Sequence, residues 1–585
     1  MVVSEEVIEI TSSQTFALFN YLNHEETYRE FTALKYRDTI SLYGHPFNKP
    51  CEGSIDSKVK FSPIMKLLYH NFIFTETLPA VRDADVTYWS EHVQVLLERI
   101  ADQNLSESYD RGRLGKRKVI GMALSVFFET ISRGVLLKYE GDETHHLELP
   151  SKPKQLVQNW IDFKRELVFN EGFFDDIISA YKVSEDPLNL PPLAQGAREY
   201  VRIQFASILH YLLVMSPDAS SILTLLEKVV GLIPWFAMRQ AFRVSNAATI
   251  VTALSKIFLT KPLFASKNLL QTIFMTILGN DQKSLEKKLY NLESGKNGPL
   301  GSTIQLNKIK LYVDFEQDKQ EAIRNYSLKK NCSIVDAILH DAGIKVSSSQ
   351  QEQINQMDFL SLLLSRRDRI RLIKLFCEDS LFTNWVRETV NIFSPIIREG
   401  HRAVDLSSKI GYLKEFMDDC IQMGNGKGEV LDWVKLVEKH ECKFHKFANS
   451  VCQSEWLVSG YTPWFKHCLA SFKPSSKLSL EGMKLSKEIS EEIETFRDHQ
   501  DKVKNDSMKR LSAVVAGQHV EKGPGEWVDV LYNLHLRALV SPQITGQQRT
   551  GQGRRSDYGL TGSNPNMAKT LAACEDDFIA RLMEL

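Results

Sequence analysis

The sequence predicts an all-α fold: a multi-helix bundle array with an apolar central helical block and a disordered C-terminal segment. Apolar residues recur at helical spacing along most of the 585 residues. Few stretches alternate strictly between apolar and polar residues, as a half-buried strand would. Residues 201–259 are the most apolar part of the chain, and they are interrupted by helix-breaking residues.

The central block is punctuated like a helical hairpin with extra turns. Ser216 is predicted to cap the helix that follows it, and Pro217 suits the first turn, where its missing N–H is not needed. Pro234 interrupts the block again, and Ser245 is expected to cap the last helix. The expected helices cover residues 203–215, 221–233, 235–243 and 246–259.

A helix that is apolar on most sides is normally surrounded by the rest of its domain. We therefore expect residues 201–259 to form the core around which the remaining helices pack.

Around this block, composition and periodicity suggest six segments. Residues 12–140 read as a small bundle of about four helices, and residues 155–475 as a second, larger helical domain. Gly, Gln, Ser, Arg and Asn dominate residues 541–567, and this segment is too polar to order itself. The other segments are a polar linker at 141–154, a charged helical extension at 476–540, the disordered segment at 541–568 and a short helix at 569–585.

The charge balance argues against a general nucleic-acid-binding protein. The chain has 72 Lys and Arg against 73 Asp and Glu, so it lacks the strong positive field that such binding needs. No run reaches the ~18 apolar residues of a membrane span, and glutamates stand where a signal peptide would be positive. With scattered cysteines and no C-x-x-C pair, we expect a cytoplasmic protein, peripheral on organelle membranes at most.

No motif in the sequence supports catalysis. The Gly-rich segment 295–302 matches neither phosphate-binding pattern, and no nucleophile or zinc-protease signature is present. His440, Cys442 and His445 lie close together, but residues five apart share a helix face poorly and no second ligand pair exists. We therefore expect no enzyme, no catalytic residue, no metal and no cofactor.

Two basic clusters are the candidates for membrane or lipid contact. Each residue close to an anionic surface contributes about 1 kcal/mol. The alternative is a solvated face paired with neighbouring acids. Arg554-Arg555-Ser556 also resembles a basophilic kinase site. The clusters consist of Arg111, Arg113, Lys116, Arg117 and Lys118, and of Arg366, Arg367, Arg369, Arg371 and Lys374.

Several motifs resemble known fungal modules. YGHPF at 43–47, PIMKLLYHNF at 63–72, YW at 88–89 and GKRK at 115–118 resemble the N-terminal PX-associated module of fungal PX-domain proteins. Further motifs resemble the domain of unknown function that follows the PX domain in the same proteins. They are LHY at 209–211, MSPD at 215–218, GLIP at 231–234, SNAAT at 245–249, LLSRRD at 363–368 and LVEKHECKFHKF at 436–447.

The resemblance covers roughly residues 12–140 and 155–475, but it departs from the family in one respect. Members usually carry a PX domain, a phosphoinositide-binding module, between the two regions. Here residues 141–195 are too few for one and contain no strand-rich segment. The resemblance implies lipid-related work at membranes, by peripheral association, trafficking or lipid transfer.

The leading hypothesis is a non-enzymatic peripheral membrane protein of lipid transfer or membrane trafficking. An apolar groove lined by residues 201–259 would hold a lipid chain or a partner helix, and Arg366, Arg367 and Arg369 would orient the groove to anionic lipids. The alternative is a cytoplasmic helical scaffold that binds proteins through its helices and C-terminal tail. The sequence leaves open the lipid, the partner, the organelle and the oligomeric state.

Overall fold

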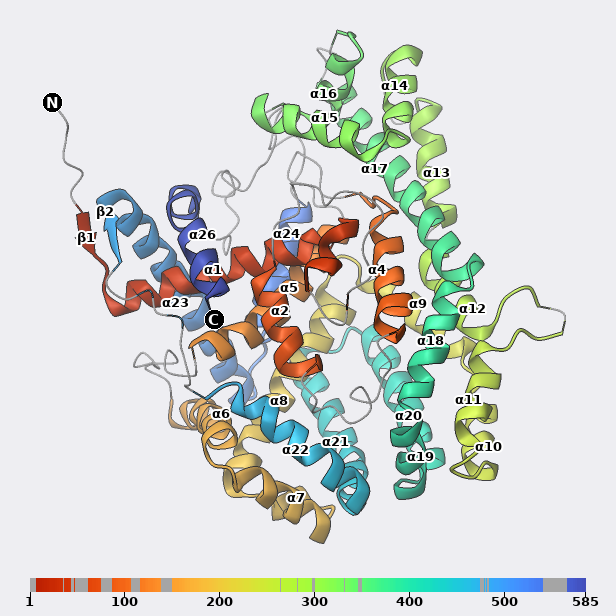
Figure 1. Ribbon diagram of the computed structural model, residues 1–585, viewed down its shortest axis with the longest axis vertical. Helices are drawn as coiled ribbons and strands as arrows, with labels where there is room; N and C mark the ends of the chain where they lie inside the picture. Colours follow the sequence, from red (N-terminus) through yellow and green to blue (C-terminus); the bar gives the residue numbers. More distant parts are fainter. Residues whose placement is uncertain are drawn as a thin grey trace.

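A computed structural model gives the arrangement of the chain. It describes residues 7–34, 36–43, 47, 62–74, 87–106, 116–137, 150–263, 265–280, 282–296, 300–330, 332–345, 350–473, 478, 480, 483–539 and 565–584. The prediction of an all-α fold is confirmed (Figure 1). The described strands are only β1 (Val7–Glu9) and β2 (Lys484–Ser486), which pair antiparallel with Ile8 opposite Leu485.

The N-terminal part is a group of helices and tight helical turns. Its longest helix, α1, is followed by shorter segments. The elements are α1 (Ser12–Ala33), η1 (Arg37–Tyr43), α2 (Pro63–Tyr69), η2 (His70–Phe74), η3 (Tyr88–Val93), α4 (Gln94–Ala101) and α5 (Lys116–Leu137).

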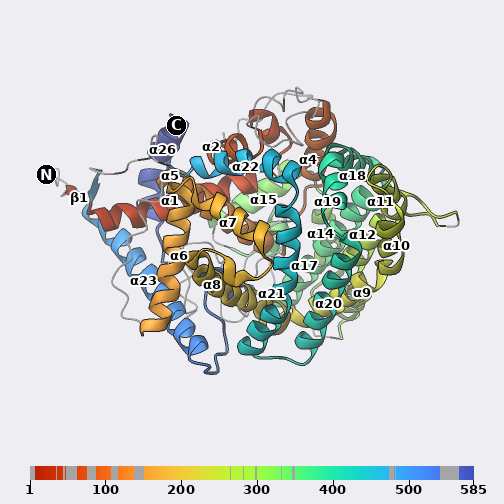
Figure 2. The same ribbon diagram turned by 90° about the horizontal axis from the view of Figure 1, so that it is seen from below.

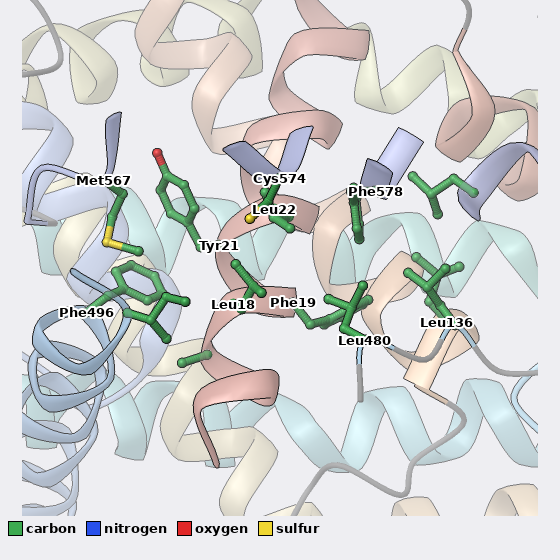
Figure 3. Close-up of a cluster of buried hydrophobic side chains, with 14 of the residues drawn as sticks. Leu18, Phe19, Tyr21, Leu22, Leu136, Leu480, Phe496, Met567, Cys574 and Phe578 are labelled. Carbon is green, nitrogen blue, oxygen red and sulfur yellow. The ribbon is translucent and has the colours of Figure 1, made fainter. Parts of the chain in front are cut away.

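Both ends of the chain build one hydrophobic core around α1. Helix α23 (Lys487–Val515) and the C-terminal helix α26 (Ala568–Met583) pack on α1 together with α5. Figure 3 shows Leu18, Phe19 and Leu22 of α1 among side chains from the C-terminal part. The rings of Phe19 and Phe578 lie 6.1 Å apart, and those of Tyr21 and Phe496 lie 5.4 Å apart. The segment predicted as an extension at 476–540 therefore contributes to this core.

Charged side chains are also buried along α1, and each has polar partners. The Glu30 carboxylate accepts hydrogen bonds from the backbone N–H groups of Ile64 and Met65, at 2.8 and 2.7 Å. These groups open α2 and have no partner within that helix. Burial, reinforced by the neighbouring Glu26, raises the pKa of Glu30 well above its ordinary value.

Helices α6 to α12 follow, and they contain the central apolar block. The predicted helical breaks at Ser216-Pro217-Asp218 and at Pro234 are confirmed. The elements are α6 (Ser151–Phe169), α7 (Phe173–Val183), η4 (Pro187–Asn189), α8 (Pro192–His210), η5 (Tyr211–Met215), α9 (Ala219–Leu232), α10 (Trp235–Val244), α11 (Ile250–Leu259) and α12 (Leu269–Gly279).

The two predicted serine caps are wrong. The Ser216 hydroxyl donates back to the carbonyl of Leu212 at 3.1 Å, so it remains attached to the preceding helix. Asp218 precedes α9 instead. Ser245 ends α10, and Thr249 precedes α11. Each serine ends the helix before it. The chain then turns over the residues that separate Ser216 from α9 and Ser245 from α11 before the next helix begins.

The expectation that residues 201–259 form the central core is also wrong. Helix α10 has no buried residue, and Phe236 and Val244 are 76% and 82% exposed. Helix α10 packs against α11 and α20 (Leu406–Asn425) and keeps an exposed outer face. Helix α11 is better covered, because it packs against α10, α12, α18 (Leu381–Ile392) and α19 (Ser394–Ala403), and its Ile250 is fully buried. Part of the block is buried, since Ala206, Leu213 and Leu223 pack with Trp433.

The remaining helices contribute to further cores. The largest of these lies among α13 to α17 and includes Tyr312 and Phe359, both fully buried. The elements are α13 (Gln282–Glu293), α14 (Thr303–Val313), α15 (Gln317–Lys330), α16 (Ile334–Asp341), α17 (Gln350–Ile373), η6 (Lys374–Glu378), α18 (Leu381–Ile392), α19 (Ser394–Ala403), α20 (Leu406–Asn425), α21 (Val430–Cys452), α22 (Glu455–Ala470) and α24 (Glu526–Leu539).

Some of the predicted segments lie outside the described residues, and one lies within them. Residues 540–564, which contain most of the predicted disordered stretch and Arg554-Arg555-Ser556, lie outside the described residues. Most of the predicted linker, at 138–149, lies outside them as well. A helix is present where a short C-terminal one is expected, and it is α26.

Replacing Phe578 by Ala tests whether α26 completes the core of α1. Phe578 is 1% exposed, so removing its ring leaves a cavity and should cost about 3–5 kcal/mol of unfolding free energy. Met583→Ala is the control on the same helix, because Met583 is 58% exposed, and it should change stability by less than ~0.5 kcal/mol. Hydrogen exchange should show loss of protection in α1 for Phe578→Ala alone. Unchanged protection in α1 would contradict this shared core.

His210 at the end of α8 predicts a loss of stability in acid. Burial lowers its pKa to about 4, against a small opposite effect of Glu429 and with a further lowering by His519. Below pH 6.5 the unfolded chain binds a proton that the folded chain does not. Stability should therefore be complete above pH 6.5 and fall as the pH approaches 4, by about 2 kcal/mol after allowing for partial solvent screening.

The measurement is urea unfolding across this pH range, with His210→Phe as the comparison. The variant removes the titrating group, so its stability should vary less with pH than that of the parent chain. Parallel pH profiles of the two proteins would show that His210 does not cause the acid sensitivity.

Candidate functional site

The predicted basic cluster on α17 divides into buried and exposed members. Arg367 is only 8% exposed, and its guanidinium donates to the backbone carbonyls of Val313 and Asn104, each at 2.9 Å. It also forms an ion pair with Asp368 at 2.9 Å. Arg371 donates to the carbonyl of Gln103 at 2.7 Å. These two arginines hold the segment after α4 against α17.

The prediction that Arg367 orients the protein on a membrane is therefore wrong for this arrangement, because its guanidinium is enclosed by protein. Arg369 is half-buried, and only Arg366 and Lys374 of this cluster are exposed. In the other cluster, Arg111 and Arg113 lie outside the described residues. Lys116, Arg117 and Lys118 begin α5, but their side chains are not among those described.

A different basic surface emerges from the central block. Between Glu227 and Asp281 the sequence contains no aspartate or glutamate, although the chain average would place about six there. This acid-free stretch holds the end of α9, all of α10 and α11, the following loop and α12. Its six cationic residues are Lys228, Arg239, Arg243, Lys256, Lys261 and Lys267.

Helix α10 presents charge and apolar surface on the same exposed side. Phe236, Arg239 and Arg243 are all exposed, and their spacing of three and four residues places them on one helix face. The end of α10 is fixed to α19, because the Nε2–H of His401 donates to the carbonyl of Ser245 at 2.8 Å. The helix thus has a fixed inner face and a solvent-facing outer face.

The loop after α11 extends this surface. Leu263 is 96% exposed, and Lys261 before it is exposed as well. Both views show the loop projecting from the edge formed by α10, α11 and α12, on the side of the molecule away from α1 and α26 (Figures 1 and 2). We call α10, α11 and this loop, residues 235–268, the basic edge.

The cations of the basic edge have no acidic partner in the described part of the chain. No ion pair there involves Arg239, Arg243, Lys256, Lys261 or Lys267, whereas most other exposed helices carry paired charges such as Lys414 with Asp418. Unpaired cations around exposed apolar side chains give a surface that favours an anionic, partly apolar partner.

One hollow in the described part of the chain lies outside the predicted groove along residues 201–259. That hollow has a volume of about 670 Å³ and lies between α6, α7 and the start of α8. Three of its lining residues are charged, which does not suit a lipid chain. It is lined by Asp162, Arg165, Glu166, Phe173, Pro191, Pro192 and Leu193.

His440 belongs to a charge network that joins α20 to α21. Its Nε2 lies 2.7 Å from the Asp419 carboxylate, which also receives Lys439 at 2.6 Å. Lys443 pairs with Glu415 at 2.7 Å. The three groups Glu415, Asp419 and His440 are close enough to hold a metal ion. However, the two lysines already neutralise both carboxylates, so the donor set does not fit a cation.

The other two residues of the predicted His and Cys group point elsewhere. His445 is buried, and its Nδ1 lies 2.8 Å from the Tyr181 hydroxyl. Cys442 is exposed. The structure thus places His440 and His445 in separate contacts, one to α20 and one to α7. Burial acts to raise the pKa of the Asp419 carboxyl. Hydrogen bonds and charge attraction from Lys439 and His440 outweigh this effect and hold that pKa below its ordinary value.

No single described helix is both long enough and apolar enough to cross a bilayer. Residues 192–215 and α9 together reach the required length and composition, but they meet at an angle of 102°.

Two family models match the chain. One, described as a domain of unknown function in PX-proteins, matches residues 173–358 and 346–474. The other, described as PX-associated, matches residues 6–134. No PX domain is matched. The resemblance inferred from the sequence motifs is therefore confirmed.

Two curated fungal relatives extend this result. The uncharacterized protein C663.15c of Schizosaccharomyces pombe is 26% identical over 88% of this chain and 90% of its own length. The PX domain-containing protein LEC1 of Saccharomyces cerevisiae is 20% identical over 70% of this chain, which corresponds to 44% of that protein. No solved structure matches significantly.

Replacing each of two neighbouring arginines on α17 by alanine tests the structural role of Arg367. Arg367→Ala removes the donor to the Asn104 carbonyl and one donor each to the Val313 carbonyl and the Asp368 carboxylate, which keep Gln320 and Ser106, so stability should fall by about 2–4 kcal/mol. Arg366→Ala, at the exposed neighbouring position, should change it by less than ~0.5 kcal/mol. Thermal unfolding measures both. Equal stability of the two variants would show that Arg367 does not stabilise the contact between the N-terminal module and α17.

Proposed function

The chain belongs to the family defined by the domain of unknown function in PX-proteins and carries a PX-associated domain, and from this premise we propose that it is a non-enzymatic peripheral membrane protein of membrane trafficking. The PX-associated domain and the PX domain-containing relative suggest a membrane-trafficking and phosphoinositide context, which supports this proposal. The relative LEC1 is named as a PX domain-containing protein, whereas no PX domain is matched in this chain. It would therefore contact membranes through its helical part, on the cytoplasmic face of an organelle.

The basic edge is the observation that supports this proposal. Its unpaired cations would each contribute about 1 kcal/mol near an anionic leaflet, and no acid of the same stretch opposes them. Phe236 and Leu263 add exposed apolar surface beside those cations. The combination resembles the interfacial elements of peripheral proteins, in which basic side chains border apolar ones.

Contact with lipid headgroups is better supported than transfer of a lipid. Transfer needs an enclosed apolar cavity for the acyl chains. The hollow beside α6 is open and has a charged lining. We therefore propose membrane association and leave lipid transfer outside the proposal.

A second candidate is a scaffold that binds other proteins. Phe444 and Phe447 on α21 are 63% and 39% exposed, and their spacing of three residues places them on one face. A partner helix could pack on such a pair. This surface lies outside the basic edge, so the two functions are separable by mutation.

Charge reversal on α10 tests membrane association. Arg239→Glu with Arg243→Glu changes the local charge by four units, so affinity for vesicles that contain anionic phospholipid should fall at least tenfold. Lys329→Glu with Lys330→Glu makes the same change on α15, at another exposed helix, and should leave most of the affinity. The measurement is vesicle co-sedimentation at ~0.15 M salt.

Neutral vesicles provide the reference for this experiment. The parent chain should bind them weakly, because little electrostatic attraction remains. If the parent chain ignores anionic vesicles as well, the membrane proposal is wrong and the scaffold becomes the better interpretation.

A further inference from the structure

Leu263 is the most exposed large apolar side chain in the described part of the chain, at 96%. It follows Pro262 in the loop between α11 and α12. The backbone N–H of Ala265 donates to the carbonyl of Pro262 at 3.0 Å, so the chain turns tightly around Leu263. A turn at this point directs the apolar side chain outward rather than letting it fold back onto α11 or α12.

The base of the loop is firmly built. Asn268 is 1% exposed, and its side chain and that of Gln271 cap the start of α12 reciprocally. The Asn268 amide also donates to the carbonyl of Leu259 and to the hydroxyl of Thr383, at 3.3 and 3.4 Å. Both ends of the loop are therefore attached to buried structure, while its tip carries no covering element.

The charge around the tip has one sign within its own segment. Lys261 and Lys267 flank it, and the nearest acid in the sequence after them is Asp281. The packed elements at the base contribute Glu378 and Asp379 at the end of η6, together with Lys374. These acids sit on the element that anchors the loop and not on the loop itself.

We propose that this loop is an insertion tip for an anionic bilayer, in which Leu263 enters the interfacial acyl region while Lys261 and Lys267 contact headgroup phosphates. This inference rests on the proposed membrane association and specifies how part of it is achieved. Long lysine side chains can place their apolar stems beside the leucine and keep their charges among the headgroups. The tip projects from the edge formed by α10, α11 and α12 (Figures 1 and 2), and Arg239 and Arg243 belong to α10.

The geometry favours a bilayer over a protein partner. A stable protein interface buries about 800 Å² on each side, far more than a single turn with one leucine offers. A bilayer requires no complementary pocket, so a small apolar tip contributes as soon as electrostatic attraction holds the edge at the surface. The tip adds to the charge-based binding and does not replace it.

The test uses Leu263→Asp in the full chain and co-sedimentation with phosphatidylcholine vesicles containing phosphatidylserine. Binding should weaken roughly tenfold, and the loss should persist at about 0.5 M salt, where charge attraction is largely screened. Leu188→Asp is the matched control: Leu188 also follows a proline, in the short helical turn η4, and it is 68% exposed. That variant should bind like the parent chain.

Hydrogen exchange gives a second readout that does not depend on folding of a variant. Addition of the same vesicles to the parent chain should protect the amides of residues 260–268 more than those around Leu188. Binding with no protection in this loop, and with equal affinity of the Leu263→Asp and Leu188→Asp chains, would overturn the insertion tip and leave electrostatic membrane association intact. No binding by the parent chain would overturn both.

Discussion

The burial of α1 by the two ends of the chain is the contact on which the rest of the structure depends. Helix α1 lies against α5 from its own module and against α23 and α26 from residues that follow the larger domain. The N-terminal module therefore cannot complete its core from residues 6–134 alone, although these residues are what the PX-associated family model matches. Closing the chain on itself in this way fixes where the larger domain begins and ends.

Polar contacts then fix the larger domain in two ways: one attaches it to this frame, and the other joins two of its own helices. Arg367 and Arg371 bind backbone carbonyls at 103–104 and so attach the end of α4 to α17. Asp419 connects α20 to α21 through Lys439 and His440. A buried charge such as that of Arg367 adds little net stability, but removing one partner leaves the other unsatisfied. Such contacts therefore specify the arrangement of helices more than they strengthen it.

The basic edge follows from the same arrangement. Helix α10 packs against α11 and α20, and α11 packs against α10, α12, α18 and α19. Their outer sides retain cations without acids, and mutual repulsion among these cations is reduced because water screens them. The excess positive charge of the basic edge therefore lowers the stability of the fold only slightly. It also orients the molecule toward a negatively charged partner.

The sequence by itself determined the helical class, most helix breaks and the family, because these depend on local periodicity, on proline and on short motifs. The helix predicted at 235–243 is found as α10, Trp235–Val244. The sequence did not show which apolar residues are buried. An exposed Phe236 and a buried Phe19 look alike in composition, and their difference arises from which distant helices cover them.

The candidate site shows the same limit. Arg366 and Arg367 are adjacent and chemically identical, yet one faces solvent and the other binds carbonyls of Val313 and Asn104. The absence of acids from 228–280 is visible in the sequence and could have indicated the basic edge. That this stretch lies on an outer edge, with Leu263 at a projecting turn, was decided only by tertiary packing. The coverage of α10 and α11 depends on α18, α19 and α20, which lie more than a hundred residues away in the chain.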